Sequence, residues 1–355
     1  MKVVRLFEDN MFEHELKAIK ELNLDLEMAV RPSQTPTEII ENAHDADIII
    51  TVYEPLTEEV LSQLPNLKLV VYRSIGFNSV DLDYANEHRL PVSHITQYCI
   101  DEVANYVIAA ILSHNRRIID FNQSVKVDHE WNYELFPDMR RLSSLTVGLI
   151  GFGNIPRLIA KRLQVFGCKL IAYDPFVVSE IFEQSNVKQA SLEEIFEQSD
   201  YISSHLPLNN STKGILNVNL FNLCQKHPVF INSSRGGVVN EEDLVAALQS
   251  GKLSYAILDV VHNENPDLNK LPFMQMDNVV LTPHIAFYSQ EAFIQGVQDN
   301  FKNIQAFLNG DLSKGEIVNL KNSVNIPHFH RDVHYPLISN KYRLSKYLLL
   351  FSHFL

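Results

Sequence analysis

Residues 145–175 constrain the fold of this chain more than any other stretch, because they read as a strand, a turn, a helix and a second strand. The run Thr146–Ile150 is apolar and β-branched, which favours a buried strand. Apolar residues then recur at helical spacing over residues 155–166, and Lys169–Tyr173 forms a second apolar run. Such a βαβ unit joins two parallel strands through a crossover helix. The stretch therefore predicts an α/β fold with a parallel sheet.

The junction between the first strand and the helix has the residues of a dinucleotide site. Gly151 permits a tight turn, and Gly153 lets the backbone approach a pyrophosphate on the helix N-terminus. Asp174 ends the second strand, about 20 residues further on, where a carboxylate can accept hydrogen bonds from ribose hydroxyls. The same carboxylate would repel a 2′-phosphate, so we expect NAD rather than NADP. The alternative is an ordinary turn between a strand and a helix.

Pro156 departs from the glycine pattern, because it stands where the third glycine of G-x-G-x-x-G is expected. Proline is tolerated in the first helical turn, where its missing N–H has no partner within the helix. Its ring nevertheless adds bulk at the position where glycine allows the helix to pack closely on the strand. The departure puts the affinity for the cofactor in question.

Composition and charge exclude several classes of protein. The chain has 355 residues, enough for two domains, with 46% hydrophobic and 21% charged residues. A net charge of −13 argues against nucleic acid as the main partner, since phosphate binding needs a basic surface. The three cysteines, Cys99, Cys168 and Cys224, are scattered, so neither a disulfide framework nor a metal site is expected.

The first residues and the hydropathy suggest where the chain resides. Met1 leads into a short strand pattern and a polar stretch, with no signal-peptide pattern. Apolar runs stay shorter than the ~18 residues that a membrane span needs. We therefore expect no membrane association and a cytoplasmic location.

The first hundred residues alternate between strand and helix patterns. We expect strands over Lys2–Phe7, Asp47–Val52 and Leu67–Tyr72, with helices between them, and hence a small parallel α/β domain. The loop Arg73–Asp81 follows the last of these strands, and its backbone N–H groups are candidates to hold an anion such as a carboxylate. The alternative is a plain loop in which Asn78 or Ser79 caps the next helix. A longer helix is expected over residues 101–119.

Four strands predicted after Asp174 all end in polar residues. These residues are His205, Arg235, Asp259 and His284. Ligands of open parallel sheets bind beyond the carboxyl ends of the strands. Four polar ends in succession therefore predict a shared cleft.

Three of the polar residues near this cleft form a minimal set for reducing a carbonyl group. Arg235 offers planar, bidentate donors that suit the carbonyl and carboxylate oxygens of a 2-keto acid. His284 can exchange a proton near neutrality, and a carboxylate such as Glu264 beside it would favour the imidazolium. Taken singly, each residue is equally compatible with a turn or loop position. Asp259 also has two interpretations, as a turn-stabilising residue or as an acceptor for the nicotinamide carboxamide.

Six motifs in a fixed order make the chain resemble a known family. VGLIGFGNIPR, IAYDP, HLPLNNST, INSSRGG, LDVVHNENP and LTPHIA together are similar to the D-isomer-specific 2-hydroxyacid dehydrogenases, in particular to the branch that includes the C-terminal-binding-protein-like and D-lactate dehydrogenase-like members. The resemblance covers about residues 1–320. It implies two Rossmann-like, doubly wound parallel-sheet domains with a cleft between them. It also implies a homodimer formed mainly through the NAD-binding domains, and closure of the cleft about two hinges.

The resemblance also implies a domain layout and roles for residues. Residues 1–100 plus 291–325 would form a discontinuous catalytic domain, and 101–290 an NAD-binding domain. Arg235 would bind substrate, Glu264 would pair with the acid, and His284 would be the general acid/base. The substrate carboxylate would bind through the backbone of Ser74, Ile75 and Gly76. Cofactor contacts would come from Gly151, Gly153, Asn154, Ile155, Asp174, Leu206, Pro207, Thr212, Ser233, Ser234 and Asp259.

Two further positions within these motifs depart from what the resemblance leads us to expect, and one segment lies beyond it. Asn154 stands where the family often has a larger or basic residue, and Arg157 is a candidate to compensate. His262 replaces the first acid of the family's acidic pair, while Glu264 is kept. Residues 326–355 read as an atypical C-terminal extension, in which three histidines (His328, His330 and His334) suggest metal binding only as the less favoured alternative.

The resulting hypothesis is an NAD-dependent oxidoreductase that interconverts a small 2-keto acid and its (R)-2-hydroxy acid. The stereochemistry follows from the resemblance alone. The alternative is an NAD(H)-sensing, corepressor-like interaction protein with little turnover. Retention of Arg235, Glu264 and His284 favours turnover, because a sensor would not need all three. The sequence leaves open which acid is the substrate, with phosphoglycerate and hydroxypyruvate as further candidates. Formate is disfavoured, because the resemblance implies a Gln partner for the histidine in that case and this chain has Glu264.

Overall fold

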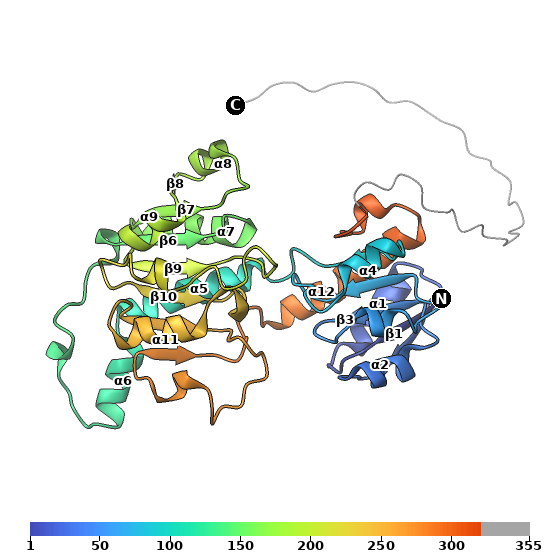
Figure 1. Cartoon of the computed structure of the whole chain (residues 1–355), viewed down its shortest axis with the longest axis horizontal. Helices are drawn as coiled ribbons and strands as arrows, with labels where there is room; N and C mark the ends of the chain where they lie inside the picture. The colour runs from blue at the N-terminus through green and yellow to red at the C-terminus, as the bar shows by residue number, and fades with distance from the viewer. Residues whose placement is uncertain (321–355) are drawn as a thin grey trace, which may run out of the picture. The chain divides into compact units, whose positions relative to one another are not determined.

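The computed structural model describes residues 1–320, and within them the strands form two parallel sheets. The first sheet has the strand order β2-β1-β3-β4-β5. Its strands are β1 Lys2–Arg5, β2 Glu27–Val30, β3 Ile48–Thr51, β4 Leu69–Tyr72 and β5 Val92–Ser93. The helices of this part are α1 Phe12–Glu21, α2 Pro36–Ala43, α3 Glu58–Leu61 and α4 Leu82–Glu87. Figure 1 shows this sheet in blue.

The second sheet has the strand order β12-β11-β10-β9-β6-β7-β8. Its strands are β6 Thr146–Ile150, β7 Lys169–Tyr173, β8 Lys188–Gln189, β9 Tyr201–Ser204, β10 Val229–Asn232, β11 Tyr255–Leu258 and β12 Val279–Leu281. The helices between them are α7 Asn154–Leu163, α8 Ser179–Gln184, α9 Leu192–Gln198, α10 Val218–Phe221 and α11 Glu241–Gln249. The strand order reverses beside β6, and this switch point is where open parallel sheets bind their ligands.

The central strands are buried because helices cover the faces of each sheet. All five residues of β6 and all four of β3 are buried, as expected for parallel strands packed on both sides. Two apolar cores lie about the second sheet, one including Val147 and Ile159, the other including Ile202 and Phe230. The fold class predicted from the sequence, two doubly wound parallel sheets, is confirmed.

The last long helix returns to the first sheet. α12 Gln290–Leu308 packs with Val297, Phe301 and Ile304 against a core that includes Val3 and Ile48. Figure 1 shows α12 in orange beside the blue elements. The chain then forms an antiparallel bridge from Ile317 to Ser93. The predicted division into residues 1–100 plus 291–325 and 101–290 stays a prediction, and each sheet falls within one of its ranges.

The helix expected over residues 101–119 is wrong in its extent. The structure has two helices there, α5 Ile100–Asn115 and α6 Ile118–Lys126. Arg117 separates them because it adopts the left-handed conformation, with φ 50°. Its guanidinium lies over the rings of Phe136 and Tyr255, at 5.1 and 5.9 Å from their centroids. Partners far along the chain therefore accompany the break, and no local pattern predicts it.

The C-terminal extension predicted over residues 326–355, with its three histidines, lies outside the described residues. Within residues 1–320, no helix combines the length and the apolar character needed to cross a membrane.

Candidate active site

The glycine turn after β6 has the conformation that a phosphate-binding turn requires. Gly151 has φ 91°, and a Cβ there would lie 2.9 Å from the carbonyl oxygen of His205. Gly153 precedes α7, and a Cβ built on it would meet no atom within 4 Å. The first-turn N–H groups of α7 are therefore approachable. A tight glycine turn, an open approach and a helix N-terminus together fit the pyrophosphate of a dinucleotide.

Asp174 holds this turn in place. Its two carboxylate oxygens each accept one backbone hydrogen bond, from the N–H of Phe152 and from that of Phe176, both at 2.9 Å. Each oxygen keeps lone-pair capacity for another donor, such as a ribose hydroxyl. The position after β7 is the one that the sequence predicts for the ribose-binding acid.

The first turn of α7 contains the two residues that depart from the expected pattern, Asn154 and Pro156. Arg157 donates from Nη2 to Oδ1 of Asn154 at 2.7 Å and from Nε to the carbonyl of Gly153 at 3.1 Å. The guanidinium of Arg157 therefore lies at the N-terminal end of α7, where it can supply the positive charge that Asn154 lacks. Pro156 is buried within the helix, where its missing N–H removes no intrahelical hydrogen bond.

One cavity of about 790 Å³ gathers most of the residues predicted for the site. Residues that follow strands of both sheets line it. The predicted members among them are Ser74, Ile75, Gly76, Gly153, Asn154, Ile155, Leu206, Pro207, Ser233, Ser234, Arg235 and His284. Glu264 lines a neighbouring cavity of about 220 Å³ together with Arg235 and Gly76. Gly151, Asp174, Thr212 and Asp259 line neither cavity.

His284 and Glu264 form a hydrogen-bonded pair. Nδ1 of His284 lies 2.7 Å from Oε2 of Glu264, so the ring donates to the carboxylate and the proton-exchanging Nε2 stays available. His284 lines the same cavity as Arg235. The hydroxyl of Tyr53 also lies 3.5 Å from Nδ1 of His284. The structure thus provides the oriented histidine that proton transfer to a substrate requires.

Arg235 has donors to spare for a ligand. It follows β10, and its Nη1 donates to the carbonyl of Ser234 at 2.7 Å. A Cβ built on Gly76 would lie 1.9 Å from Nη2 of Arg235, so the guanidinium packs directly on the backbone of the loop predicted to bind the carboxylate. The structure therefore brings together the loop 74–76 and Arg235.

Asp259 builds the turn that carries His284. Its buried carboxylate accepts from the hydroxyl of Thr282 at 2.5 Å and from the N–H groups of Ile285 and Ala286 at 2.8 and 2.9 Å. The N–H of His284 donates to the carbonyl of Asp259 at 2.9 Å. His284 itself has φ 54°, which is costly for a residue other than glycine. Of the two interpretations left by the sequence, the turn-stabilising one has its hydrogen bonds here, and contact with a cofactor stays a prediction.

Thr212 has a comparable bracing role. Its hydroxyl donates to the carbonyl of Pro207 at 2.6 Å and accepts from the N–H of Asn209 at 2.9 Å. The loop 206–212 is therefore held by its own side chains. The predicted cofactor contact of Thr212 remains a prediction.

The helix that follows the loop after β4 is capped by a different residue from the two that the sequence predicted. Asp81, rather than Asn78 or Ser79, caps α4, since its side chain accepts from the N–H of Tyr84 at 2.9 Å. Asn78 instead donates to the carbonyl of Leu208 at 2.5 Å. The side chain thus joins the predicted carboxylate loop to the predicted cofactor loop.

Some residues that line the larger cavity were not predicted from the sequence as site residues. Phe7, Glu8 and Asp9, just after β1, line the larger cavity, as does Arg73. The rule that ligands bind beyond the carboxyl ends of parallel strands applies to β1 and β4 as well, and would have pointed to them.

Comparison with known proteins gives a consistent result. Residues 108–286 match the model of the NAD-binding domain of the D-isomer specific 2-hydroxyacid dehydrogenases. A hydroxypyruvate reductase of Blautia hydrogenotrophica is 34% identical over 280 residues, which are 77% of this chain and 85% of that protein. A D-3-phosphoglycerate dehydrogenase of Methanocaldococcus jannaschii is 29% identical over 91% of this chain and 60% of its own length.

A solved structure is similar over nearly the whole described chain. It is the D-lactate dehydrogenase of Aquifex aeolicus, crystallised with NAD and lactic acid. The match has a TM-score of 0.79 and 31% sequence identity, and it covers 90% of this chain and 99% of that one.

Proposed function

This chain belongs to the family of D-isomer specific 2-hydroxyacid dehydrogenases, and we propose that Arg235, Glu264 and His284 carry its reaction. The family activity is the NAD-dependent interconversion of 2-keto acids and D-2-hydroxy acids. The observation that supports the proposed roles is the 2.7 Å pair of His284 and Glu264, on a histidine that shares a cavity with Arg235.

In this proposal the chain supplies binding, orientation and a proton. Arg235 donates to the carbonyl and carboxylate oxygens of the keto acid, and the backbone of residues 74–76 binds the carboxylate. Nε2 of His284 gives its proton to the carbonyl oxygen, and Glu264 stabilises the imidazolium beforehand. Bound NADH supplies the hydride that the carbonyl carbon receives. The carbonyl π bond is thereby replaced by one C–H and one O–H bond.

The proposed cofactor contacts are those that the family resemblance implies. The turn at Gly151 and Gly153, with Asn154 and Ile155, would hold the pyrophosphate, and Asp174 would accept from the ribose. The remaining proposed contacts are Leu206, Pro207, Thr212, Ser233, Ser234 and Asp259. The carboxylate of Asp174 favours NAD over NADP, because a 2′-phosphate would lie against it.

The first test is oxidation of NADH, followed optically, against a panel of 2-keto acids with NADPH in parallel. His284→Ala should lower kcat by about 100-fold or more while NADH binding survives, because the proton donor is removed and the glycine turn is untouched. A rate near that of the unmodified protein would remove His284 from the chemistry. Clear NADH binding without turnover of any keto acid would favour the sensing alternative.

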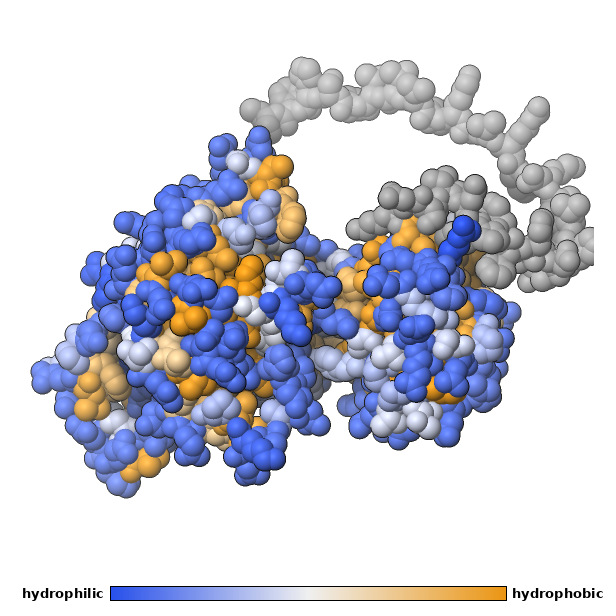
Figure 2. All heavy atoms as spheres, in the orientation of Figure 1, coloured by the Kyte–Doolittle hydropathy of each residue, from blue (hydrophilic) through white to orange (hydrophobic). Residues whose placement is uncertain are grey.

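We further propose a homodimer in the cytoplasm. Apolar and aromatic side chains are exposed on α6 and in the segment that follows it: Ile118 (58%), Ile119 (51%), Val127 (59%), Trp131 (90%) and Tyr133 (85%). Figure 2 shows hydrophobic residues at the surface in the region of α6. A second copy of the chain is the occupant that we propose for this surface. Sedimentation analysis tests it, and a monomer at micromolar concentration would overturn it.

A further inference from the structure

We propose that the substrate of this site carries a single anionic group, its carboxylate, and an uncharged side chain. The inference rests on the function proposed above and narrows its substrate class. It excludes dicarboxylic and phosphate-bearing keto acids as good substrates. The argument depends on the charges that line the larger cavity.

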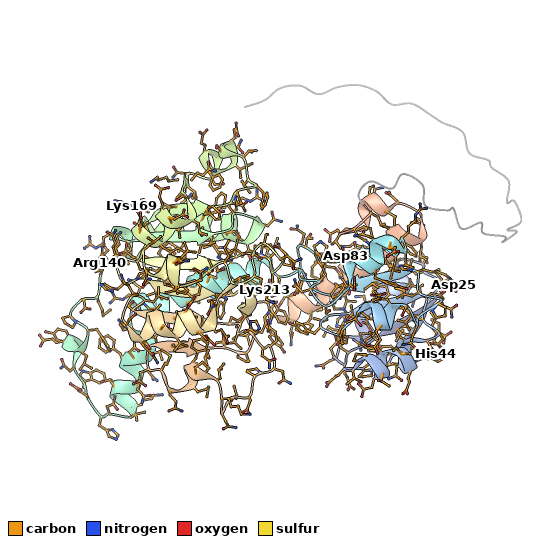
Figure 3. The ribbon with its side chains drawn as sticks, viewed as in Figure 1. Asp25, His44, Asp83, Arg140, Lys169 and Lys213 are labelled. Atoms are coloured by element: carbon orange, nitrogen blue, oxygen red, sulfur yellow. The ribbon has the colours of Figure 1, made fainter. Side chains whose placement is uncertain are left out.

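Among residues 1–320, only Arg73 and Arg235 of the residues that line this cavity are Lys or Arg. The guanidinium of Arg235 makes one hydrogen bond within the described part of the chain, from Nη1 to the carbonyl of Ser234, and its other donors are free. Other Lys and Arg side chains of the described residues lie outside this cavity. Arg140, Lys169 and Lys213, labelled in Figure 3, are exposed and do not line the cavity.

Arg73 is already neutralised by buried partners. Its Nη1 donates to Asp9 at 3.0 Å, its Nη2 donates to Glu15, and its Nε donates to Asn300 at 2.9 Å. The side chain is 3% exposed and that of Glu15 is fully buried. Withdrawing one member of such a buried set leaves an uncompensated charge, which is strongly unfavourable. Arg73 is therefore unavailable to a ligand.

Arg5 completes this cluster and balances its charge. Its guanidinium pairs with Asp9 and lies 3.4 Å from Glu15, and the side chain is 1% exposed. Two guanidinium groups thus meet two carboxylates. The cluster as a whole presents no net positive charge to the cavity.

The remaining charges of the wall are negative. Glu54 lines the cavity, and its Oε2 accepts from the Thr51 hydroxyl at 2.7 Å and from the N–H of Val52 at 2.9 Å. Glu8 lines it too and has no ion pair among residues 1–320. Among residues 1–320, Arg235 is thus the one Lys or Arg side chain of the cavity that is available to a ligand, and the substrate carboxylate uses it, while the proposed imidazolium of His284 serves the carbonyl oxygen. A second anionic group would find no partner and would be repelled by these acids.

Matched pairs of keto acids test this directly. With saturating NADH at low ionic strength, kcat/KM for the 5-methyl ester of 2-oxoglutarate should exceed that for 2-oxoglutarate by about 100-fold, because the two differ chiefly in the charge of the distal group. Hydroxypyruvate should likewise exceed 3-phosphohydroxypyruvate. Equal or better turnover of the doubly charged member of either pair would overturn the inference and leave the proposed function standing. Failure with every keto acid, neutral ones included, would overturn both.

A second experiment reverses the charge of one acidic residue that lines the cavity. Glu8→Lys should shift the ratio of kcat/KM for the methyl ester to kcat/KM for 2-oxoglutarate toward the dicarboxylate by about 10-fold, since it replaces a repulsive charge by an attractive one. Glu13→Lys, an exposed position on α1 outside the cavity, is the matched control for net charge. The same shift in both variants, or no shift in Glu8→Lys, would contradict the claim that the acids lining the cavity disfavour a second anionic group on the substrate.

Discussion

At the scale of single residues, Gly76 shows how little room the site leaves. A Cβ there would lie 1.9 Å from Nη2 and 2.9 Å from Cζ of Arg235. The clash involves the flexible end of a side chain, so Gly76→Ala should fold normally and displace the guanidinium. We expect KM for the keto acid to rise by about 10-fold or more, through weakened charged hydrogen bonds, with the melting temperature nearly unchanged.

Steady-state kinetics and calorimetry check this prediction. Gly315→Ala is a suitable control, because the added Cβ would have only ordinary contacts, at 3.6 Å or more. An unchanged KM in Gly76→Ala would mean that Arg235 binds substrate from another position, or does not bind it at all.

At the scale of elements, two loops beyond the strand ends are joined by one hydrogen bond. Asn78 follows β4 and donates to the carbonyl of Leu208, which follows β9. Since residues 74–76 are proposed to bind the substrate and 206–212 the cofactor, this bond couples the two ligands. Asn78→Ala should reduce by about 5-fold or more the gain in NADH affinity that oxamate, a non-reducible substrate analogue, produces.

The coupling is measured as the ratio of NADH dissociation constants with and without oxamate. Asn66→Ala is the matched control, because Asn66 lies near the first sheet and donates to His44 instead. If the ratio in Asn78→Ala equals that in the control, the hydrogen bond carries no coupling.

At the scale of the whole molecule, buried histidines make stability depend on pH. Burial, with a smaller contribution from Arg117, lowers the pKa of His114 from 6.5 to about 4, and burial lowers that of His205 to about 3. Below pH 6.5 the unfolded chain therefore binds protons that the folded chain refuses. Stability is full above this pH and falls as the pH drops toward 4, on the order of 3 kcal/mol for each ring.

Urea unfolding over this pH range checks the sign and size of the effect. His114→Phe should flatten the dependence, because the ring that refuses the proton is gone. The variant also loses the hydrogen bond between Nδ1 of His114 and the Tyr201 hydroxyl, which are 2.9 Å apart, so its free energy of unfolding at neutral pH should be lower than that of the unmodified chain. A slope as steep as that of the unmodified chain would show that other groups dominate acid unfolding.

Much of the second sheet was predictable, because its signals are local. The predicted ranges of β6 and β7 coincide with those of the structure. Continuous apolar runs are typical of parallel strands buried on both faces, and Asn240 and Gly251 bound the helix α11 on either side. The short strands β2 and β8 were missed, because neither is buried enough to show an apolar run.

By itself the sequence determined the α/β class, the dinucleotide turn and the polar residues at the strand ends. Each of these depends on residues close together in the chain. Only the tertiary structure decided what those residues touch. The bond between Arg73 and Asn300 spans 227 positions, and that between Asn78 and Leu208 spans 130. Whether an arginine is free or neutralised depends on such distant partners, and spacing along the chain carries no information about them.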